Sequence, residues 1–125
     1  TFLERFGDSL SRGDLKAASG AWAIPALVLS DEGVVAVSKA SEVEEFFAKA
    51  TEWYRSQGLV ATKPEVERIE SVAERLTAVD VRWPTFDAAG QEKTSERSHY
   101  ILEQGRDGQL RIRLALTRTT EPGKH

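Results

Sequence analysis

The spacing of apolar residues changes halfway along this 125-residue chain, and the change limits the folds that the chain can adopt. From Phe2 to Gly58 most apolar side chains recur every three or four positions, as on one face of a helix. From Val79 onward they alternate with polar side chains, as in strands that bury one face. Helices followed by strands predict an α+β fold, and the length suits a single domain.

Three helices are predicted in the first half. The first ends at Gly13, and Asp14 then caps a second, short helix whose apolar side includes Trp22. Ser41 and Glu44 have the spacing of a capping box, in which each side chain accepts a hydrogen bond from a free amide. A third, longer helix is therefore expected to begin at Ser41.

Strands are predicted from alternation and from turn residues. Two short β-type runs, 26–29 and 34–37, are expected to form a hairpin between the second and third helices. The turn sequences 87–90 and 107–108 divide the second half into three antiparallel strands, because Asp-Gly tolerates the positive φ angles of a tight turn. Residues 64–76 are ambiguous: their apolar residues have helical spacing, so the local pattern favours a helix as much as a strand.

The order of these elements resembles the nuclear transport factor 2-like superfamily, which includes ketosteroid isomerases and SnoaL-like polyketide cyclases. The resemblance covers nearly the whole chain and depends on four short segments: 12–15, the helix from Ser41, 81–83 and 107–112. It implies a cystatin-like cone, in which a strongly curved antiparallel sheet wraps around about three helices, with an internal pocket and often a homodimer. On this basis residues 64–76 are predicted to be strand with a turn near Ala73-Glu74. The domain is expected to span 1–119, and 120–125 to form a flexible tail.

Strand pairing counted back from the two turns divides the meander into two faces. It places Asp80 opposite Arg97, Ala78 opposite His99, and His99 opposite Leu116. A slip of one residue would exchange the two faces. The first face collects Ala78, Asp80, Arg97, His99, Ile101, Ile112, Leu114 and Leu116. The second collects Val79, Val81, Trp83, Ser98, Tyr100, Leu102, Arg113 and Ala115.

The first face is largely aliphatic but carries an acid, a base and an imidazole. One hypothesis makes Asp80, Arg97 and His99 the polar floor of an apolar pocket, where Arg97 and His99 hold a ligand carboxylate or carbonyl. The other makes them a structural cross-strand ion pair beside a hydrogen-bonded histidine. Pocket walls are chiefly apolar and aromatic, so aromatic residues of the helices are either core or ligand-binding: Trp22, Phe46 and Tyr54.

The ketosteroid isomerase pattern, as the resemblance implies it, puts a general base in the first hairpin, where this chain has Asp31. The same pattern places a tyrosine donor at Phe6, which has no hydroxyl, and a protonated acid near Arg97. That mechanism is therefore not expected. Another metal-independent acid–base enzyme, of the cyclase, isomerase or dehydratase kind, would use Asp31 or His99 as its catalytic proton carrier. Asp31 is equally explained as a turn residue that faces water.

Composition excludes other classes of chemistry. The chain has no cysteine, two histidines and a net charge of −3, so neither a metal nor another cofactor is expected. Without a basic block, a nucleic-acid partner is not expected, and without an apolar run of ~20 residues, nor is a membrane. No secretory segment is visible, and we expect the cytoplasm. Three hypotheses remain: a domain that binds a small apolar molecule carrying a polar group, an acid–base enzyme, and a dimerisation module using Val81, Trp83 and Tyr100.

Overall fold

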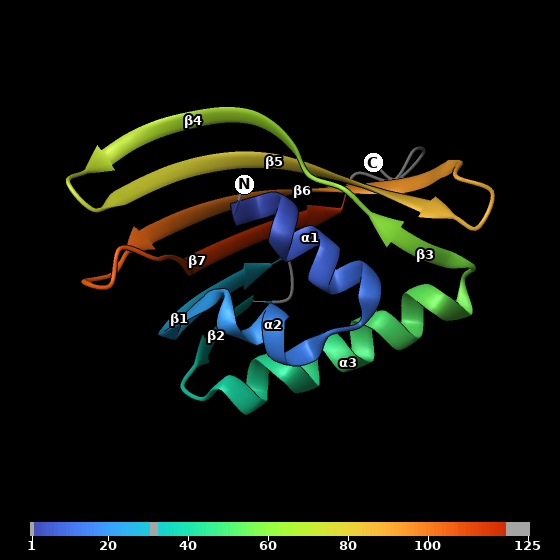
Figure 1. Cartoon of the computed structure of the whole chain (residues 1–125), viewed down its shortest axis with the longest axis horizontal. Helices are drawn as coiled ribbons and strands as arrows, with labels where there is room; N and C mark the ends of the chain where they lie inside the picture. Colours follow the sequence, from blue (N-terminus) through green and yellow to red (C-terminus); the bar gives the residue numbers. More distant parts are fainter. Residues whose placement is uncertain (1, 31–32, 120–125) are drawn as a thin grey trace.

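The computed structural model describes residues 2–30 and 33–119, which form three helices and seven strands (Figure 1). In chain order they are α1 (Phe2–Arg12), α2 (Leu15–Gly20), β1 (Trp22–Ser30), β2 (Gly33–Val37), α3 (Ala40–Ser56), β3 (Leu59–Thr62), β4 (Glu65–Ala73), β5 (Leu76–Asp87), β6 (Glu92–Gln104) and β7 (Leu110–Thr119). The predicted tail 120–125 and Asp31 lie outside the described residues.

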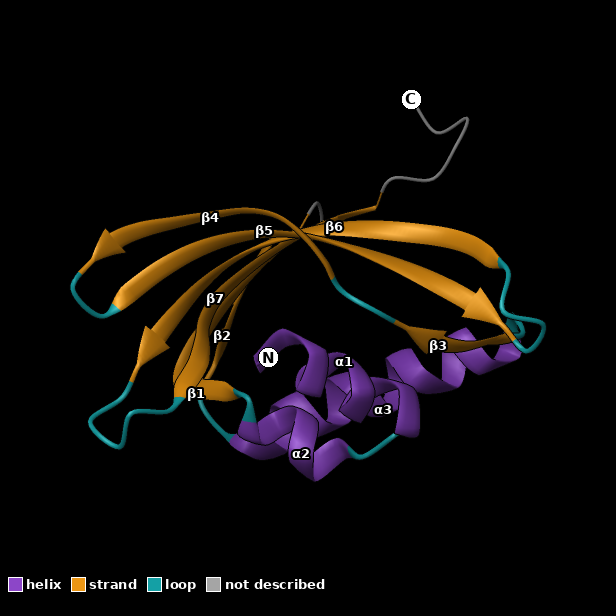
Figure 2. Ribbon diagram, turned by 45° about the horizontal axis from the view of Figure 1, so that its top comes forward, coloured by secondary structure: helices purple, strands orange, loops and turns teal. Residues whose placement is uncertain are grey.

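All seven described strands form one curved sheet that arches over the three helices (Figure 2). The order is β2-β1-β7-β6-β5-β3. β3 and β4 share one edge of β5: β3 pairs with its residues 85–87 and β4 with its residues 76–82. The predicted α+β cone is confirmed. The pairing of β1 with β7 is parallel, however, so the sheet is mixed and not wholly antiparallel.

The segment with ambiguous periodicity is a strand. β4 pairs antiparallel with β5, and its turn follows Ala73, as the family resemblance implies. Every residue of β4 is exposed, including the apolar Val66 and Ile69. The helical spacing therefore reflects no buried helix face, and pairing with the long β5 strand decides the conformation.

Two helix boundaries differ from those expected. The first helix does end before Gly13, whose φ is +71°, and Asp14 does cap the second. The second helix stops at Gly20, and Trp22 opens β1 instead, because it pairs with Ile112 of β7. The predicted continuation of this helix to Trp22 is therefore wrong.

The start of α3 is set by a different residue pair from the one predicted. The helix begins at Ala40, and Glu42 Oε1 accepts hydrogen bonds from the backbone N–H groups of Ser38 (2.8 Å) and Lys39 (3.0 Å). The predicted box of Ser41 and Glu44 is therefore wrong by two residues. A carboxylate at this position also suits the positive end of the helix dipole.

The strand register shows which side chains share a face of the sheet. In β5–β6, Asp80 lies opposite His99 and Arg82 opposite Arg97, two residues from the predicted pairing, with an irregularity between Thr85 and Phe86. A shift of two residues preserves which side chains share a face. The β6–β7 pairing His99–Leu116 is as predicted.

A bulge between Ile101 and Leu102 changes the face of one predicted residue. It places Ile112 opposite Leu102, and both side chains are in the core, with Ile112 completely buried. The assignment of Ile112 to the same face as His99 is therefore wrong. An extra residue in one strand reverses the alternation beyond it, and nothing in the local pattern of the strand reveals that residue.

Candidate functional site

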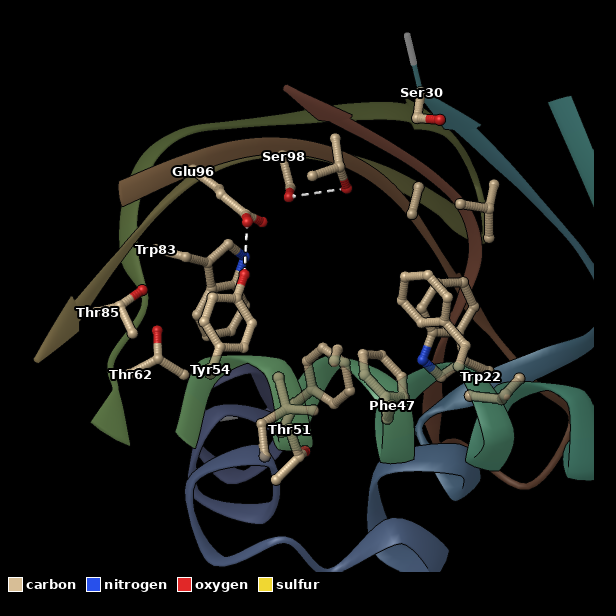
Figure 3. A pocket seen from close by; sticks show the side chains of 18 of the residues that line it. Trp22, Ser30, Phe47, Thr51, Tyr54, Thr62, Trp83, Thr85, Glu96 and Ser98 are labelled. Atoms are coloured by element: carbon tan, nitrogen blue, oxygen red, sulfur yellow. Dashed lines mark hydrogen bonds between the residues drawn. The ribbon is translucent and has the colours of Figure 1, made fainter. Parts of the chain in front are cut away.

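A cavity of about 670 Å³ lies between the helices and the concave face of the sheet (Figure 3). Its walls come from α1, α3, the β1–β2 hairpin, β3 and the inward face of β5, β6 and β7. Most of the lining is apolar or aromatic, as in ligand-binding cavities. The side chains on which the site depends are Phe6, Trp22, Phe46, Phe47, Ala50, Tyr54, Trp83, Glu96, Ser98, Tyr100 and Thr117.

Aromatic rings from the helices and the sheet pack edge to face around the apolar part of the cavity. The ring centroid of Phe6 lies 5.8 Å from that of Phe47 and 5.9 Å from that of Trp83. Phe47 also lies 6.1 Å from Trp22. Because each ring contacts the next, this wall is held by packing and does not depend on a ligand for its shape.

Tyr54 and Glu96 form the polar end of the cavity. The Tyr54 hydroxyl, from α3, donates a hydrogen bond to Glu96 Oε1 of β6 at an O···O distance of 2.5 Å (Figure 3). Burial raises the pKa of Tyr54 well above its ordinary value, and the neighbouring Glu96 carboxylate raises it further. Tyr54 therefore stays protonated at neutral pH and donates its hydrogen bond to the carboxylate.

The two indoles of the cavity wall differ in their hydrogen bonding. Trp83 Nε1 donates to the Tyr100 hydroxyl at 2.9 Å, and burial raises the pKa of Tyr100 to about 12. Trp22 Nε1 is buried and has no hydrogen-bond partner among the described residues. A buried donor of this kind is normally satisfied, but the Trp22 nitrogen itself is enclosed by protein atoms, so it offers no donor to the cavity.

Hydroxyl groups complete the sheet side of the cavity. Ser98 Oγ and Thr117 Oγ1 lie 3.3 Å apart on neighbouring strands. Thr62 donates from its hydroxyl to the Pro84 carbonyl and from its backbone N–H to Ser11 Oγ, which ties α1 to β3. The contact between Thr62 and Ser11 holds α1 against β3, and the other two join neighbouring strands.

Three of the predicted site residues lie in the cavity wall: Trp22, Phe46 and Tyr54. Phe46 is 60% exposed, so the expectation that it belongs to the core is wrong, and its exposed position in the lining puts it at the open side of the cavity. Their role in binding remains a prediction. Asp31 lies outside the described residues, so its catalytic role stays a prediction.

The other three predicted residues are not in the cavity lining. His99 Nδ1 lies 2.6 Å from Asp80 Oδ1, and both side chains are about 40% exposed, on the face of the sheet turned away from the helices. Arg97 pairs with Glu67 of β4, with Nε 3.1 Å from Oε1, and not with Asp80. The expectation that these residues form the polar floor of a pocket is therefore wrong, because the curvature turns the other face inward.

Glu96 is the lining residue that sequence reasoning missed. It lies opposite Trp83 in the β5–β6 register, and it alternates along β6 with Ser98 and Tyr100, which also face the cavity. That alternation was visible in the sequence. The missing information was which of the two faces the helices cover.

The described part of the chain holds no group of three or more histidine, aspartate or glutamate side chains arranged to bind a metal ion. Within the same residues, no helix is both long and apolar enough to cross a membrane. The polar groups of the cavity lining are two phenols, the carboxylates of Glu42 and Glu96, the Arg55 guanidinium and several hydroxyls.

Solved structures with similar folds share little sequence with this chain. A domain of unknown function with a cystatin-like fold from Nostoc punctiforme matches with a TM-score of 0.76 and 18% identity, over 98% of this chain and 75% of that one. An NTF-2 like protein of unknown function from Shewanella oneidensis MR-1 matches with a TM-score of 0.71 and 15% identity, over 93% and 92%. A ketosteroid isomerase-like protein from Erwinia carotovora atroseptica matches with a TM-score of 0.70 and 10% identity, over 94% and 90%. At these identities the likeness extends to the fold alone.

No curated protein matches the chain. The family model described as NTF2-like protein (DUF6841) matches residues 1–120, nearly the whole sequence. The cone, its cavity and this match agree, and the chain belongs to that NTF2-like family.

Proposed function

We propose that the domain binds a small, mainly apolar molecule that carries a polar group, in the cavity between α3 and the sheet. The observation that carries the proposal is a cavity of about 670 Å³ with an aromatic wall and one hydrogen-bonded carboxylate–phenol pair. That volume falls in the range of small-molecule sites, and a few fixed polar groups in an apolar wall are what orients a ligand.

A cavity-filling substitution tests the proposal. Ala50 lines the cavity from α3, whereas Ala48 is exposed on the same helix and does not. The fluorescence of Nile red, a neutral apolar dye, should increase on binding to the protein, and Ala50→Trp should weaken its binding by about tenfold or more. Ala48→Trp should leave binding unchanged. Absence of Nile red binding, or equal effects of the two variants, would contradict binding in this cavity.

A second candidate function is acid–base catalysis, favoured by the Tyr54–Glu96 pair. His99 is outside the cavity, so a proton carrier acting there would be Glu96, with Tyr54 as the donor that stabilises developing negative charge on an oxygen. The test is exchange of the protons next to the carbonyl of 4-phenylbutan-2-one in heavy water, followed by NMR. Exchange above background that Glu96→Gln abolishes would support catalysis, and background exchange in the wild-type protein would refute it for ketones.

We also propose a homodimer, with a corrected interface. Val81, Trp83 and Tyr100 are buried under the helices and cannot mediate association. The exposed apolar side chains of β4, which include Ile69 at 68% exposure, lie at one edge of the sheet and favour an interface there. Light scattering should give twice the 13.8 kDa chain mass, and Ile69→Asp should reduce it to one chain. A monomer in the wild-type protein would refute the proposal.

A further inference from the structure

We infer that the cavity selects an organic cation: a protonated amine placed at Glu96, on an apolar body that fills the aromatic part of the cavity. This inference depends on the proposed binding function and specifies the chemical class of its ligand. It reverses the charge preference expected from Arg97 and His99, which would favour a carboxylate.

The first observation is that Glu96 has no cationic partner. Its side chain accepts a hydrogen bond from the neutral Tyr54 hydroxyl, and no arginine, lysine or histidine of the described residues forms an ion pair with it. The described glutamates that have an arginine partner, such as Glu67 and Glu103, lie outside the cavity. A partly buried carboxylate loses hydration, and a ligand ammonium would restore a favourable partner to it.

The second observation is the aromatic surroundings of this carboxylate. Glu96 lies directly opposite Trp83 on the neighbouring strand, and Tyr54 contacts it from α3. Tyr100, also in the wall, is close enough for the charge of Glu96 to act on its hydroxyl. An ammonium group bound at Glu96 would therefore lie among aromatic rings, whose faces attract cations and not anions.

The other charged groups of the lining do not change this preference. Glu42 is engaged at the start of its own helix, where it accepts two backbone hydrogen bonds. Arg55 is exposed, and its guanidinium lies close to Gly13 at the turn between α1 and α2. Arg55 is the one basic side chain in the described lining, so if the cavity bound anions more tightly than cations, Arg55 would be the group responsible.

Calorimetric titration with three probes of one shape tests the charge preference: 4-phenylbutan-1-amine, 4-phenylbutan-1-ol and 4-phenylbutanoate at pH 7. The amine should bind about tenfold more tightly than the carboxylate and at least about threefold more tightly than the alcohol. Equal binding of amine and alcohol, or tighter binding of the carboxylate, would overturn the inference. The wild-type comparison decides this even if a variant fails to fold.

Glu96→Gln keeps the size and hydrogen-bonding capacity of the side chain and removes its charge. It should bring the amine and the alcohol to within about twofold of each other. Glu52→Gln removes the same charge from an exposed position on α3 and should leave the preference intact. If both variants lose the preference for the amine, that preference comes from the net charge of the whole protein, and the assignment to Glu96 is wrong.

If none of these probes binds, the inference fails, and Nile red binding then shows whether the proposed cavity function fails with it.

Discussion

Removal of the Tyr54 hydroxyl tests whether the polar end of the cavity stabilises the fold. Tyr54→Phe takes away the hydrogen bond to Glu96, in which an O–H donor lies 2.5 Å from a carboxylate oxygen. Hydrogen bonds to charged groups contribute about 1.5–3 kcal/mol. Glu96 is only partly buried, so water replaces part of the lost bond, and we expect a loss of about 1–2 kcal/mol in the free energy of unfolding.

The assay is urea denaturation followed by tryptophan fluorescence and circular dichroism at pH 7. A loss of this size lowers the melting temperature by roughly 5 °C for a chain of this length. A double-mutant cycle with Glu96→Gln should give a coupling energy of about 1 kcal/mol, because the two groups contact each other directly. Glu52→Gln, on the exposed side of α3, is the control and should change stability by less than about 0.5 kcal/mol.

Two results would refute this reasoning. If Tyr54→Phe has no effect on stability, the short hydrogen bond is replaced by water at no net loss. If both single variants are destabilised but their effects add, the two residues act through separate contacts and the pair is not a unit.

Two further predictions concern a glycine contact and an acidic side chain. Gly7→Ala should destabilise the fold by about 1 kcal/mol despite better helix propensity, because a Cβ would lie 3.0 Å from the Trp83 ring. Gly20→Ala is the control: its Cβ would have nothing within 4 Å, so it should be neutral or stabilising in the same urea assay. Equal effects of the two variants would contradict the contact argument. The hydrogen bond from Arg111 lowers the pKa of Asp107 to about 2, so its contribution is present above its unfolded pKa of about 4 and is lost as the pH falls toward 2. Melting curves of Asp107→Asn and wild type should therefore differ at pH 7 and converge as the pH falls from about 4 to about 2, and a constant difference would refute the linkage.

Local sequence patterns were sufficient for most of the elements. Gly13, with its positive φ, and the Asp-Gly turn at 107–108 each impose a local backbone conformation, so their positions in the fold could be predicted. The helix start at Glu42 and the conversion of Trp22 to strand could not, because a cap two residues away and a parallel partner in β7 compete with the local signal.

The helix side of the candidate site was predictable from local spacing, whereas the sheet side was not. Helical spacing placed Phe46 and Tyr54 on the cavity side of α3, since a helix face follows from spacing alone. In β6 the alternation separated Glu96 from His99, but both faces carry apolar and polar residues, so composition did not tell which one the helices cover.

The sequence by itself determined the α+β class, the side chains of β5 and β6 that share a sheet face, and the absence of cysteine chemistry, because each follows from local periodicity or composition. Only the tertiary structure decided that Trp83, Glu96 and Tyr100 line the cavity while Asp80 and His99 lie outside it. The direction of sheet curvature made that choice, and the bulge beside Leu102 moved Ile112 to the inner face. Both arise from the packing of strands against helices far away in the chain, which no local pattern records.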